Sequence, residues 1–317
     1  MLKKFNLNFK ISRIGKAVTI AVHSGGFHAD DVCAVAALKI MLGDRARVQI
    51  KRTRDMSLIF AADYVVDVGG IHDAGKNRFD HHQSGGAGER ANGIPYAAFG
   101  LVWLAYGEKI AGSKQAADMI EEKLVMPTDA NDNGVSISKE VFPDIRSYDL
   151  SSIVRAMNPN WDEEGKNAAD GDLLADKNFL EAVALAEKVL MREIESAHSV
   201  VEGEKFTLDA YEKTSDKRII VLDGPYPWGR VISKFPEPLF VVYPKHNVWR
   251  IYAVRNNLNS FENRKNLPAA WAGKRDAELS AIAGVPGALF CHNKLFTASA
   301  ETKEAALAMA AIAVANT

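Results

Sequence analysis

Apolar residues near the start of the chain occur in short runs separated by polar turns. Val18–Val22 is an apolar run that predicts a buried strand, and Asp31–Leu42 is rich in alanine and leucine, which predicts a helix. Two further strands are expected at Arg47–Arg52 and Asp63–Val68, and two glycines follow the second. This succession predicts a parallel α/β sheet, which binds its ligands at the carboxyl ends of the strands.

The rest of the chain predicts several helices and then a second group of strands. Helical patterns cover residues 96–111, 114–124, 146–158 and 176–198, whereas the polar stretch 161–172 predicts a loop. Strands are expected at 218–222, 239–243 and 248–254, and a terminal helix at 302–315. We therefore expect a domain boundary near residue 199, with domains at 17–199 and 200–317.

Composition and charge restrict the class of protein. The chain has 317 residues, of which 47% are hydrophobic and 25% charged, so it can bury a core without disulfides. A formal net charge of -1 provides no general attraction for polyanions, which would need a local basic cluster. The only cysteines, Cys33 and Cys291, exclude a four-thiolate zinc site and are expected to be free thiols in a reducing cytosol.

The sequence predicts a cytoplasmic protein. Apolar runs are all too short to span a bilayer, so we expect no membrane partner. The first sixteen residues carry five basic residues and no acid. They lack the apolar core of a secretory signal and are poor in serine, so we interpret them as a basic N-terminal extension.

Histidines and aspartates gather where the predicted elements end. Four segments carry them, namely His23-Ser-Gly-Gly-Phe-His28-Ala-Asp30-Asp31, Asp67-Val-Gly-Gly, Asp80-His81-His82-Gln83 and Asp129-Ala-Asn-Asp132-Asn-Gly134. Each segment alone could be a helix cap or a turn, the last one above all. Together they predict a metal centre, because converging buried carboxylates need partners and cations are the simplest ones.

The ligand types indicate which metal to expect. Imidazole and carboxylate ligands without thiolates suit Mn²⁺ and could accept Zn²⁺, Fe²⁺ or Co²⁺. Mg²⁺ normally takes fewer protein ligands, all of them oxygen. We therefore favour Mn²⁺.

The ordered set of motifs resembles the DHH phosphoesterases, which include RecJ-type exonucleases and manganese-dependent pyrophosphatases. Within this group the chain is similar to the Myg (melanocyte-proliferating-gene) family of predicted hydrolases and exonucleases. The matching segments are HxxxFHxD at 23–30, DVGG at 67–70, FDHHQ at 79–83, DANDNG at 129–134, WRIYAV at 249–254, RKNLPAAWAGKRDAEL at 264–279 and GVPGALFCHNKLF at 284–296. Three departures are Ser24-Gly25-Gly26, where the family usually has Asn-Gly-Thr, Asp31, where it commonly has Glu, and Thr297–Thr302, which replaces Gly-Gly-Asn-Lys-Thr.

The resemblance implies a DHH-type N-terminal domain, with a parallel sheet and helices on both faces, as the catalytic domain. A smaller α/β domain of the DHH-associated type would bind substrate, with a cleft between the two. One divalent metal ion would be held by His23, His28 and Asp67, and a second by Asp30, Asp67, His81 and Asp129. Asp67 would bridge the two ions, and Asp132 is an alternative to Asp129.

The resemblance also implies the reaction. His82 would lie beside the metals and act on substrate, and Asp80 would orient His81. Two cations about 3.5–4 Å apart can clamp the attacking and leaving oxygens of an in-line displacement and lower the pKa of a bound water. The expected products are a phosphate monoester and an alcohol.

A basic region in the second domain is the candidate substrate site. Residues 245–275 hold seven Lys or Arg against one acid. We expect phosphate contacts from four arginines, Arg250, Arg255, Arg264 and Arg275. The aromatic residues Trp249, Tyr252, Phe261 and Trp271 could stack on bases or belong to the core. The segment 284–292 resembles a substrate loop, in which Gly287 and His292 would contact phosphate.

The expected function is hydrolysis of phosphodiester bonds in RNA, oligonucleotides or nucleotide phosphoesters, in particular 3′-to-5′ exonuclease activity on RNA. One alternative is a small-molecule phosphatase that acts on pyrophosphate or very short oligonucleotides with the same metals. Another is a non-catalytic, nucleotide-binding regulatory protein, against which the complete ligand set argues. No feature supports peptide hydrolysis. An oligomer is compatible with the sequence.

Overall fold

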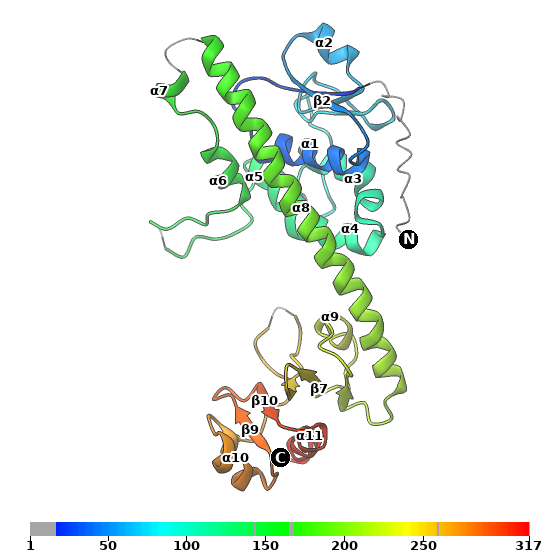
Figure 1. Cartoon of the computed structure of the whole chain (residues 1–317), viewed down its shortest axis with the longest axis vertical. Helices are drawn as coiled ribbons and strands as arrows, with labels where there is room; N and C mark the ends of the chain where they lie inside the picture. The colour runs from blue at the N-terminus through cyan, green and yellow to red at the C-terminus, as the bar shows by residue number, and fades with distance from the viewer. Residues whose placement is uncertain (1–16, 143, 165–167, 259, 317) are drawn as a thin grey trace, which may run out of the picture. The chain divides into compact units, whose positions relative to one another are not determined.

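The computed structural model describes residues 17–142, 144–164, 168–258 and 260–316 (Figure 1). The basic stretch at 1–16 lies outside the described residues. The chain divides into two compact units, Met1–Ala197 and His198–Thr317. The catalytic and substrate-binding roles expected of the two domains, and the cleft between them, stay predictions.

The first unit is built on a sheet in the order β2-β1-β3-β5-β4. Its strands are β1 (Val18–Val22), β2 (Val48–Arg52), β3 (Tyr64–Val66), β4 (His72–Asp73) and β5 (Arg78–Phe79). Strands β2, β1, β3 and β5 pair in the parallel direction, whereas β4 pairs with β5 in the antiparallel direction. Parallel pairing brings the carboxyl ends of β1, β3 and β5 to one edge of the sheet, and each is followed by one of the predicted polar segments.

Helices cover both faces of this sheet, which confirms the predicted α/β fold. Ile59 of α2 (Met56–Ala61) and Ala62, the C-cap of that helix, pack against Ala21 and Val65. Because side chains alternate along a strand, the neighbours of Ala21 point to the opposite face. There α1 (Ala29–Leu42), buried over its first ten residues, packs against β3 and α3 (Ala98–Ala111).

The first unit contains several further helices, and the last of them is long and continues beyond Ala197. They are η1 (Ala74–Lys76), α4 (Lys114–Ile120), the π-helical segment η2 (Glu121–Val125), α5 (Met126–Asp132), α6 (Leu150–Ala156), α7 (Trp161–Glu164) and α8 (Ala168–Lys213). The loop predicted at 161–172 is therefore wrong in part, since polar residues such as Glu163 favour a helix as readily as a loop. Gly203 lies within α8, where a Cβ would lie 2.4 Å from Pro227 Cδ, so only glycine fits.

The second unit holds another five-stranded sheet, in the order β6-β7-β8-β10-β9. Its elements are β6 (Ile219–Val221), α9 (Gly229–Ile232), β7 (Phe240–Lys245), β8 (Val248–Ala253), η3 (Ala269–Trp271), α10 (Asp276–Ala283), β9 (Ala288–Cys291), β10 (Thr297–Ala300) and α11 (Lys303–Ala315). Val242 and Ile251 pack with Met309 of α11 on one face, and Val241 lies in a separate core on the other. This unit is also α/β, as predicted.

Cys33 and Cys291 are both buried and free. Within the described ranges, no helix combines the length and the apolar character needed to cross a membrane.

Candidate metal centre

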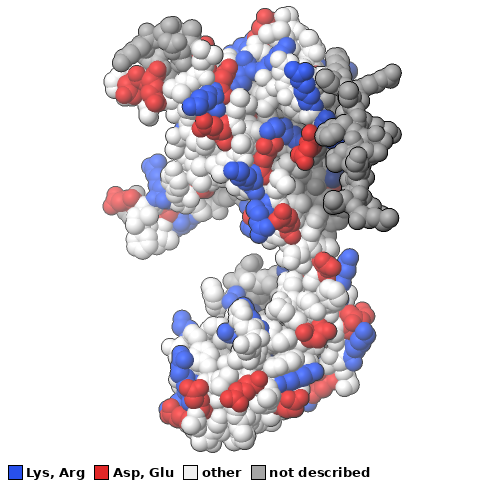
Figure 2. Space-filling model, in the orientation of Figure 1, with Lys and Arg blue, Asp and Glu red and all other residues white. Residues whose placement is uncertain are grey.

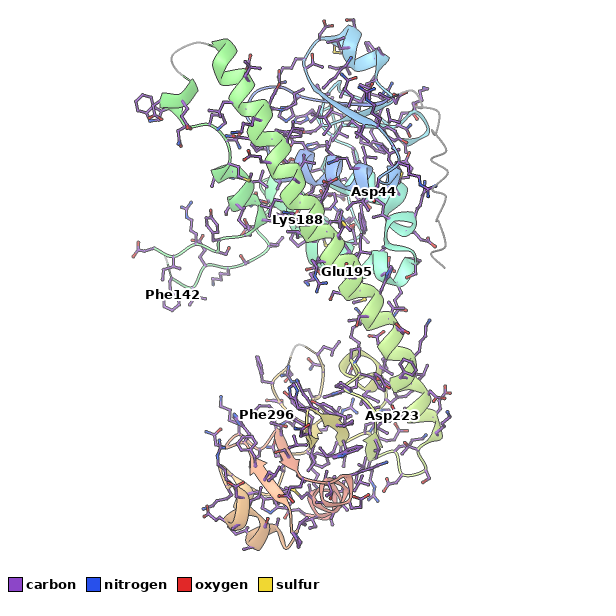
Figure 3. All side chains as sticks on the ribbon, viewed as in Figure 1. Asp44, Phe142, Lys188, Glu195, Asp223 and Phe296 are labelled. Carbon is purple, nitrogen blue, oxygen red and sulfur yellow. The ribbon has the colours of Figure 1, made fainter. Side chains whose placement is uncertain are left out.

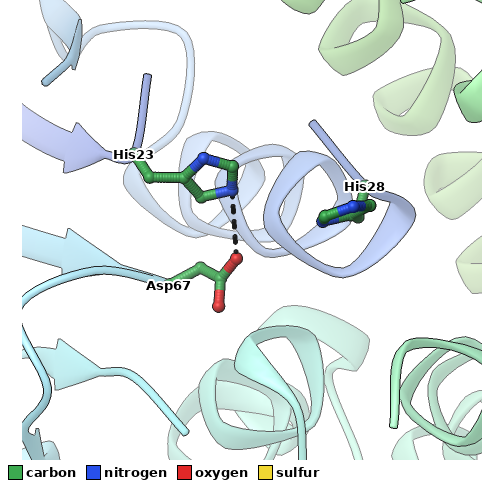
Figure 4. Close-up of side chains that lie close together, drawn as sticks. All are labelled: His23, His28 and Asp67. Carbon is green, nitrogen blue, oxygen red and sulfur yellow. Dashed lines mark ion pairs between the residues drawn. The ribbon is translucent and has the colours of Figure 1, made fainter. Parts of the chain in front are cut away.

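Asp67, which follows β3, lies at the middle of the predicted cluster. Its Oδ2 is 3.2 Å from Nε2 of His23, and its Oδ1 is 3.2 Å from Nε2 of His81 and 3.3 Å from Nδ1 of His82. Figure 4 shows the contact with His23 and the position of His28 at the start of α1. Because its two oxygens face different imidazoles, Asp67 is placed as a bridging ligand would be. Its φ of 54° is rare for a residue with a side chain.

Three overlapping groups could each hold a cation. They are His23, His28 and Asp67; Asp67, His81 and His82; and His28, Asp30 and Asp132, with the ligand atoms of each group within 4.8 Å of one another. His81 links the last two groups, because its Nε2 lies 3.3 Å from Asp132 Oδ2 and 3.9 Å from Asp30 Oδ2. The structure thus brings together side chains from four sequence segments.

Asp129 lies apart from this cluster, and Asp132 takes the place expected for it. The Asp129 carboxylate is fully buried and accepts hydrogen bonds from Arg90 Nη2 at 2.7 Å and from the Gly100 N–H at 3.0 Å. Asp132, one turn further along α5, faces His81. The geometry therefore favours Asp132 over Asp129 as the metal ligand.

Two further aspartates hold the imidazoles in place. Asp80 Oδ1 is 2.8 Å from Nδ1 of His82, so Asp80 orients His82 and not His81, which corrects our expectation. Asp31, to which the sequence assigned no role, places Oδ2 3.1 Å from Nε2 of His23 while Oδ1 accepts from the His28 N–H at 3.0 Å. Its position in the first turn of α1, where acids cap helices, was the available signal.

The loop between β1 and α1, which carries His23 and His28, is fixed by residues outside it. The Asn158 side chain accepts a hydrogen bond from the Phe27 N–H at 2.8 Å and donates one to the Phe27 carbonyl at 2.9 Å. The guanidinium of Arg52 bonds to the Gly25 carbonyl and lies over the Phe27 ring. Within the loop, Nδ1 of His23 lies 3.2 Å from the Ser24 carbonyl. A proton held there leaves Nε2 free to bind a metal.

The buried acids fit a cation. Asp30 Oδ1 is buried without a hydrogen-bond partner among the described residues, and the buried Asp31 Oδ2 and Asp67 Oδ1 face imidazole nitrogens of His23 and His81. Burial, together with the charges of Asp67 and Asp132, raises the pKa of Asp30 well above its usual range. Burial lowers the pKa of His23, but hydrogen bonds to Asp31 and Asp67 outweigh it and raise the value to about 10. These carboxylates therefore need positive charge, which divalent ions supply.

Two cavities meet at the cluster. One of about 470 Å³ is lined by Asp30, Asp132, Asn131 and Arg155, and another of about 340 Å³ by His23, Arg54 and Asp80, among others. His28, Asp67 and His82 line both cavities. The candidate ligands are thus accessible to a small molecule or a chain end.

The expected phosphate-binding residues of the second unit differ in their availability. Arg264 is occupied, because its guanidinium donates to the carbonyls of Phe235, Pro238 and Ser233. The guanidinium groups of Arg255 and Arg275 lie 4.8 Å from the ring centroids of Phe261 and Phe290, respectively. Arg250 lies on β8, and its Nε is buried without a hydrogen-bond partner among the described residues. Gly287 has a positive φ and packs against Glu301, and the His292 ring lies tilted against Phe296 with centroids 4.5 Å apart. Phosphate binding by these residues stays a prediction.

Comparison with known proteins agrees with the motif order. Residues 19–314 match the model of an uncharacterised protein family, UPF0160 (MYG1_exonuc). A MYG1 protein of Caenorhabditis elegans is 33% identical and covers 92% of this chain and 93% of its own length. The MYG1 exonuclease of Homo sapiens is 29% identical, and the match covers 92% of this chain and 84% of the human protein. A crystal structure of RecJ with Mg²⁺ from Thermus thermophilus is 12% identical and covers 94% of this chain and 50% of its own, but its TM-score of 0.28 is too low to support an inference.

Proposed function

This chain belongs to the MYG1 family (UPF0160), and we propose that it is a metal-dependent hydrolase of phosphodiester bonds that acts as an exonuclease. One observation carries the proposal: each oxygen of Asp67 faces a different imidazole, beside the buried Asp30, whose Oδ1 has no hydrogen-bond partner among the described residues. We further propose that two divalent ions, Mn²⁺ in preference to others, bind there and that single-stranded RNA is cleaved from its 3′ end.

His23, His28, Asp30, Asp67, His81 and Asp132 would hold the metals. When bound, two such ions supply a water of lowered pKa and stabilise charge on the attacking and leaving oxygens. The chain itself contributes His82, whose ring is 62% exposed and lines both cavities. Hydrogen bonding to Asp67, opposed by partial burial and supported by Asp80, raises the pKa of His82 to about 9.

His82 is therefore placed to act on the substrate as a proton donor. Its Nδ1 is taken by Asp80, which leaves Nε2 to face the cavities. A proton at Nε2 can hydrogen-bond to a phosphoryl oxygen or to the leaving oxygen. Asp80 keeps the ring in this orientation, in the way that a carboxylate behind a histidine usually does.

The test is a hydrolysis screen with Mn²⁺-loaded protein. The substrates are 5′-labelled and 3′-labelled single-stranded RNA, a dinucleotide and pyrophosphate. We expect stepwise shortening of the 5′-labelled RNA and early release of the 3′ label. Asp67→Ala should be inactive, whereas Asp118→Ala, which removes an exposed acid paired with Lys114, should match the wild type.

Each alternative corresponds to a defined outcome. Faster turnover of pyrophosphate or the dinucleotide than of the long RNA would identify a small-molecule phosphatase with the same metals. Metal-loaded protein that hydrolyses none of the four substrates would contradict the enzyme assignment and favour a nucleotide-binding regulatory protein.

A further inference from the structure

A large groove adjoins the metal centre within the first unit. It has a volume of about 860 Å³, and we call it the loop groove. Its lining residues include Asn131, Lys139, Glu140, Arg146, Asp149 and Arg155. Most of them belong to the segment between α5 and α6, which extends away from the sheet in Figure 1.

The loop groove carries three exposed basic side chains, Lys139, Arg146 and Arg155, against two acids, Glu140 and Asp149. Asp149 caps α6 by accepting from the Ser152 N–H and hydroxyl, both at 2.9 Å. Glu140 lies 3.9 Å from Arg146. Lys139 and Arg155 are exposed, and their side chains make no hydrogen bond or ion pair with a described residue. The groove is therefore suited to a ligand that presents several anionic oxygens.

The loop groove is continuous with the metal centre. Asn131 and Arg155 line both the groove and the cavity of about 470 Å³ that contains Asp30, Asp67 and Asp132. An extended ligand with one end at the metals would reach the groove past Arg155. A dinucleotide or pyrophosphate, by contrast, would be accommodated largely beside the metals.

Exposed aromatic residues on the same segment favour unpaired bases. Phe142 is 65% and Tyr148 is 73% exposed, and Figure 3 shows Phe142 at the tip of the segment. Stacking on aromatic faces is available to single strands and not to a closed duplex. Figure 2 shows acidic and basic residues mixed over the visible surface, so attraction for a polyanion must come from a local set such as this one.

We propose that the loop groove binds the sugar-phosphate backbone of single-stranded nucleic acid upstream of the bond that is cleaved. Lys139 and Arg146 contact phosphates along the groove, and Arg155 contacts a phosphate where the groove meets the metal centre. This inference rests on the proposed function, since it names the path of that enzyme's substrate.

The test compares a short and a long substrate in a charge-reversal variant. Lys139→Glu with Arg146→Glu changes two side chains remote from the candidate metal ligands. Lys188→Glu is the matched control, because Lys188 is exposed on α8 and lines none of the cavities described above. Steady-state rates are measured on a dinucleotide and on a labelled single strand of about ten nucleotides, within the usual range of single-strand sites.

The double variant should lower kcat/KM for the longer strand at least about tenfold through KM, and change the dinucleotide rate by less than about twofold. Loss of two phosphate contacts should reduce the slope of log affinity against log salt by about 1.4. Arg155→Ala should impair both substrates, because Arg155 lines both cavities. Lys188→Glu should behave as the wild type.

Binding of the labelled strand is measured in parallel by fluorescence anisotropy in excess chelator, so that the groove is tested even without turnover. If the wild type hydrolyses neither substrate, the proposed function fails, and weaker binding by the double variant alone would still support the groove. Equal losses on both substrates, or unchanged binding of the longer strand, would overturn the inference.

Discussion

Replacing Asp129 and Asp132 one at a time by alanine separates a structural carboxylate from a proposed metal ligand. Asp129 is fully buried against Arg90, whose side chain is 7% exposed. Removing one partner of a buried ion pair costs about 3–5 kcal/mol, because it leaves the other charge uncompensated. Arg90 keeps Glu121 and the Pro95 carbonyl as partners, so we expect a loss near 3 kcal/mol for Asp129→Ala.

Asp132→Ala should have the opposite profile. The Asp132 side chain is 15% exposed and faces His81, and its charge adds to the repulsion that raises the pKa of Asp30. Without metal, its removal should leave stability unchanged or slightly higher. With metal, the loss of a direct ligand should weaken binding by at least the roughly 10–100-fold seen when an outer partner of a ligand is removed.

The assays are thermal denaturation in chelator and calorimetric titration with Mn²⁺. A loss of about 3 kcal/mol corresponds to a fall in Tm of about 6–12 °C for a unit of this size. Asp129→Asn retains an oxygen for the Gly100 N–H and should lose less stability than Asp129→Ala. If Asp129→Ala lost metal at unchanged Tm, and Asp132→Ala bound metal normally, our placement of the two residues would be refuted.

Further predictions concern the loop, the packing and the metals. Asn158→Ala should lower Mn²⁺ affinity by about 10–100-fold in calorimetry, because it frees the backbone of Phe27 between His23 and His28. Gly100→Ala should destabilise by about 1–3 kcal/mol in denaturant titrations, because its Cβ would lie 1.8 Å from Asp129 Oδ2; Gly229→Ala, whose Cβ would meet nothing closer than 3.7 Å, is the tolerated control. Chelation should abolish hydrolysis and lower stability by about 2.7 kcal/mol for each bound ion, relative to protein in metal at a hundred times Kd, with recovery when Mn²⁺ is returned.

The sequence predicted well the site residues that follow strands, because each polar residue comes directly after an apolar strand pattern. Val18–Val22 is predicted and observed with the same bounds, and His23 follows it directly. Asp67 and Asp80 likewise follow β3 and β5. Parallel pairing then brings these ends together without further information.

The helical part of the site could not be predicted in the same way. The segment from Asp129 to Gly134 has the composition of a turn, yet Asp129 and Asp132 lie on α5. The π-helical segment Glu121–Val125 comes just before α5 and shifts the rotational phase of that helix. Which of the two aspartates faces His81 depends on that phase, and the spacing of residues does not reveal it.

The central claim is that these histidines and aspartates hold a close pair of divalent ions. The most direct test is to measure, by elemental analysis, the metal bound to wild-type protein and to Asp67→Ala after equilibration with Mn²⁺ and removal of free ion. We predict about two Mn²⁺ per wild-type chain and loss of both from the variant. Wild-type protein without bound metal, or Asp67→Ala that retains the full amount, would contradict the claim.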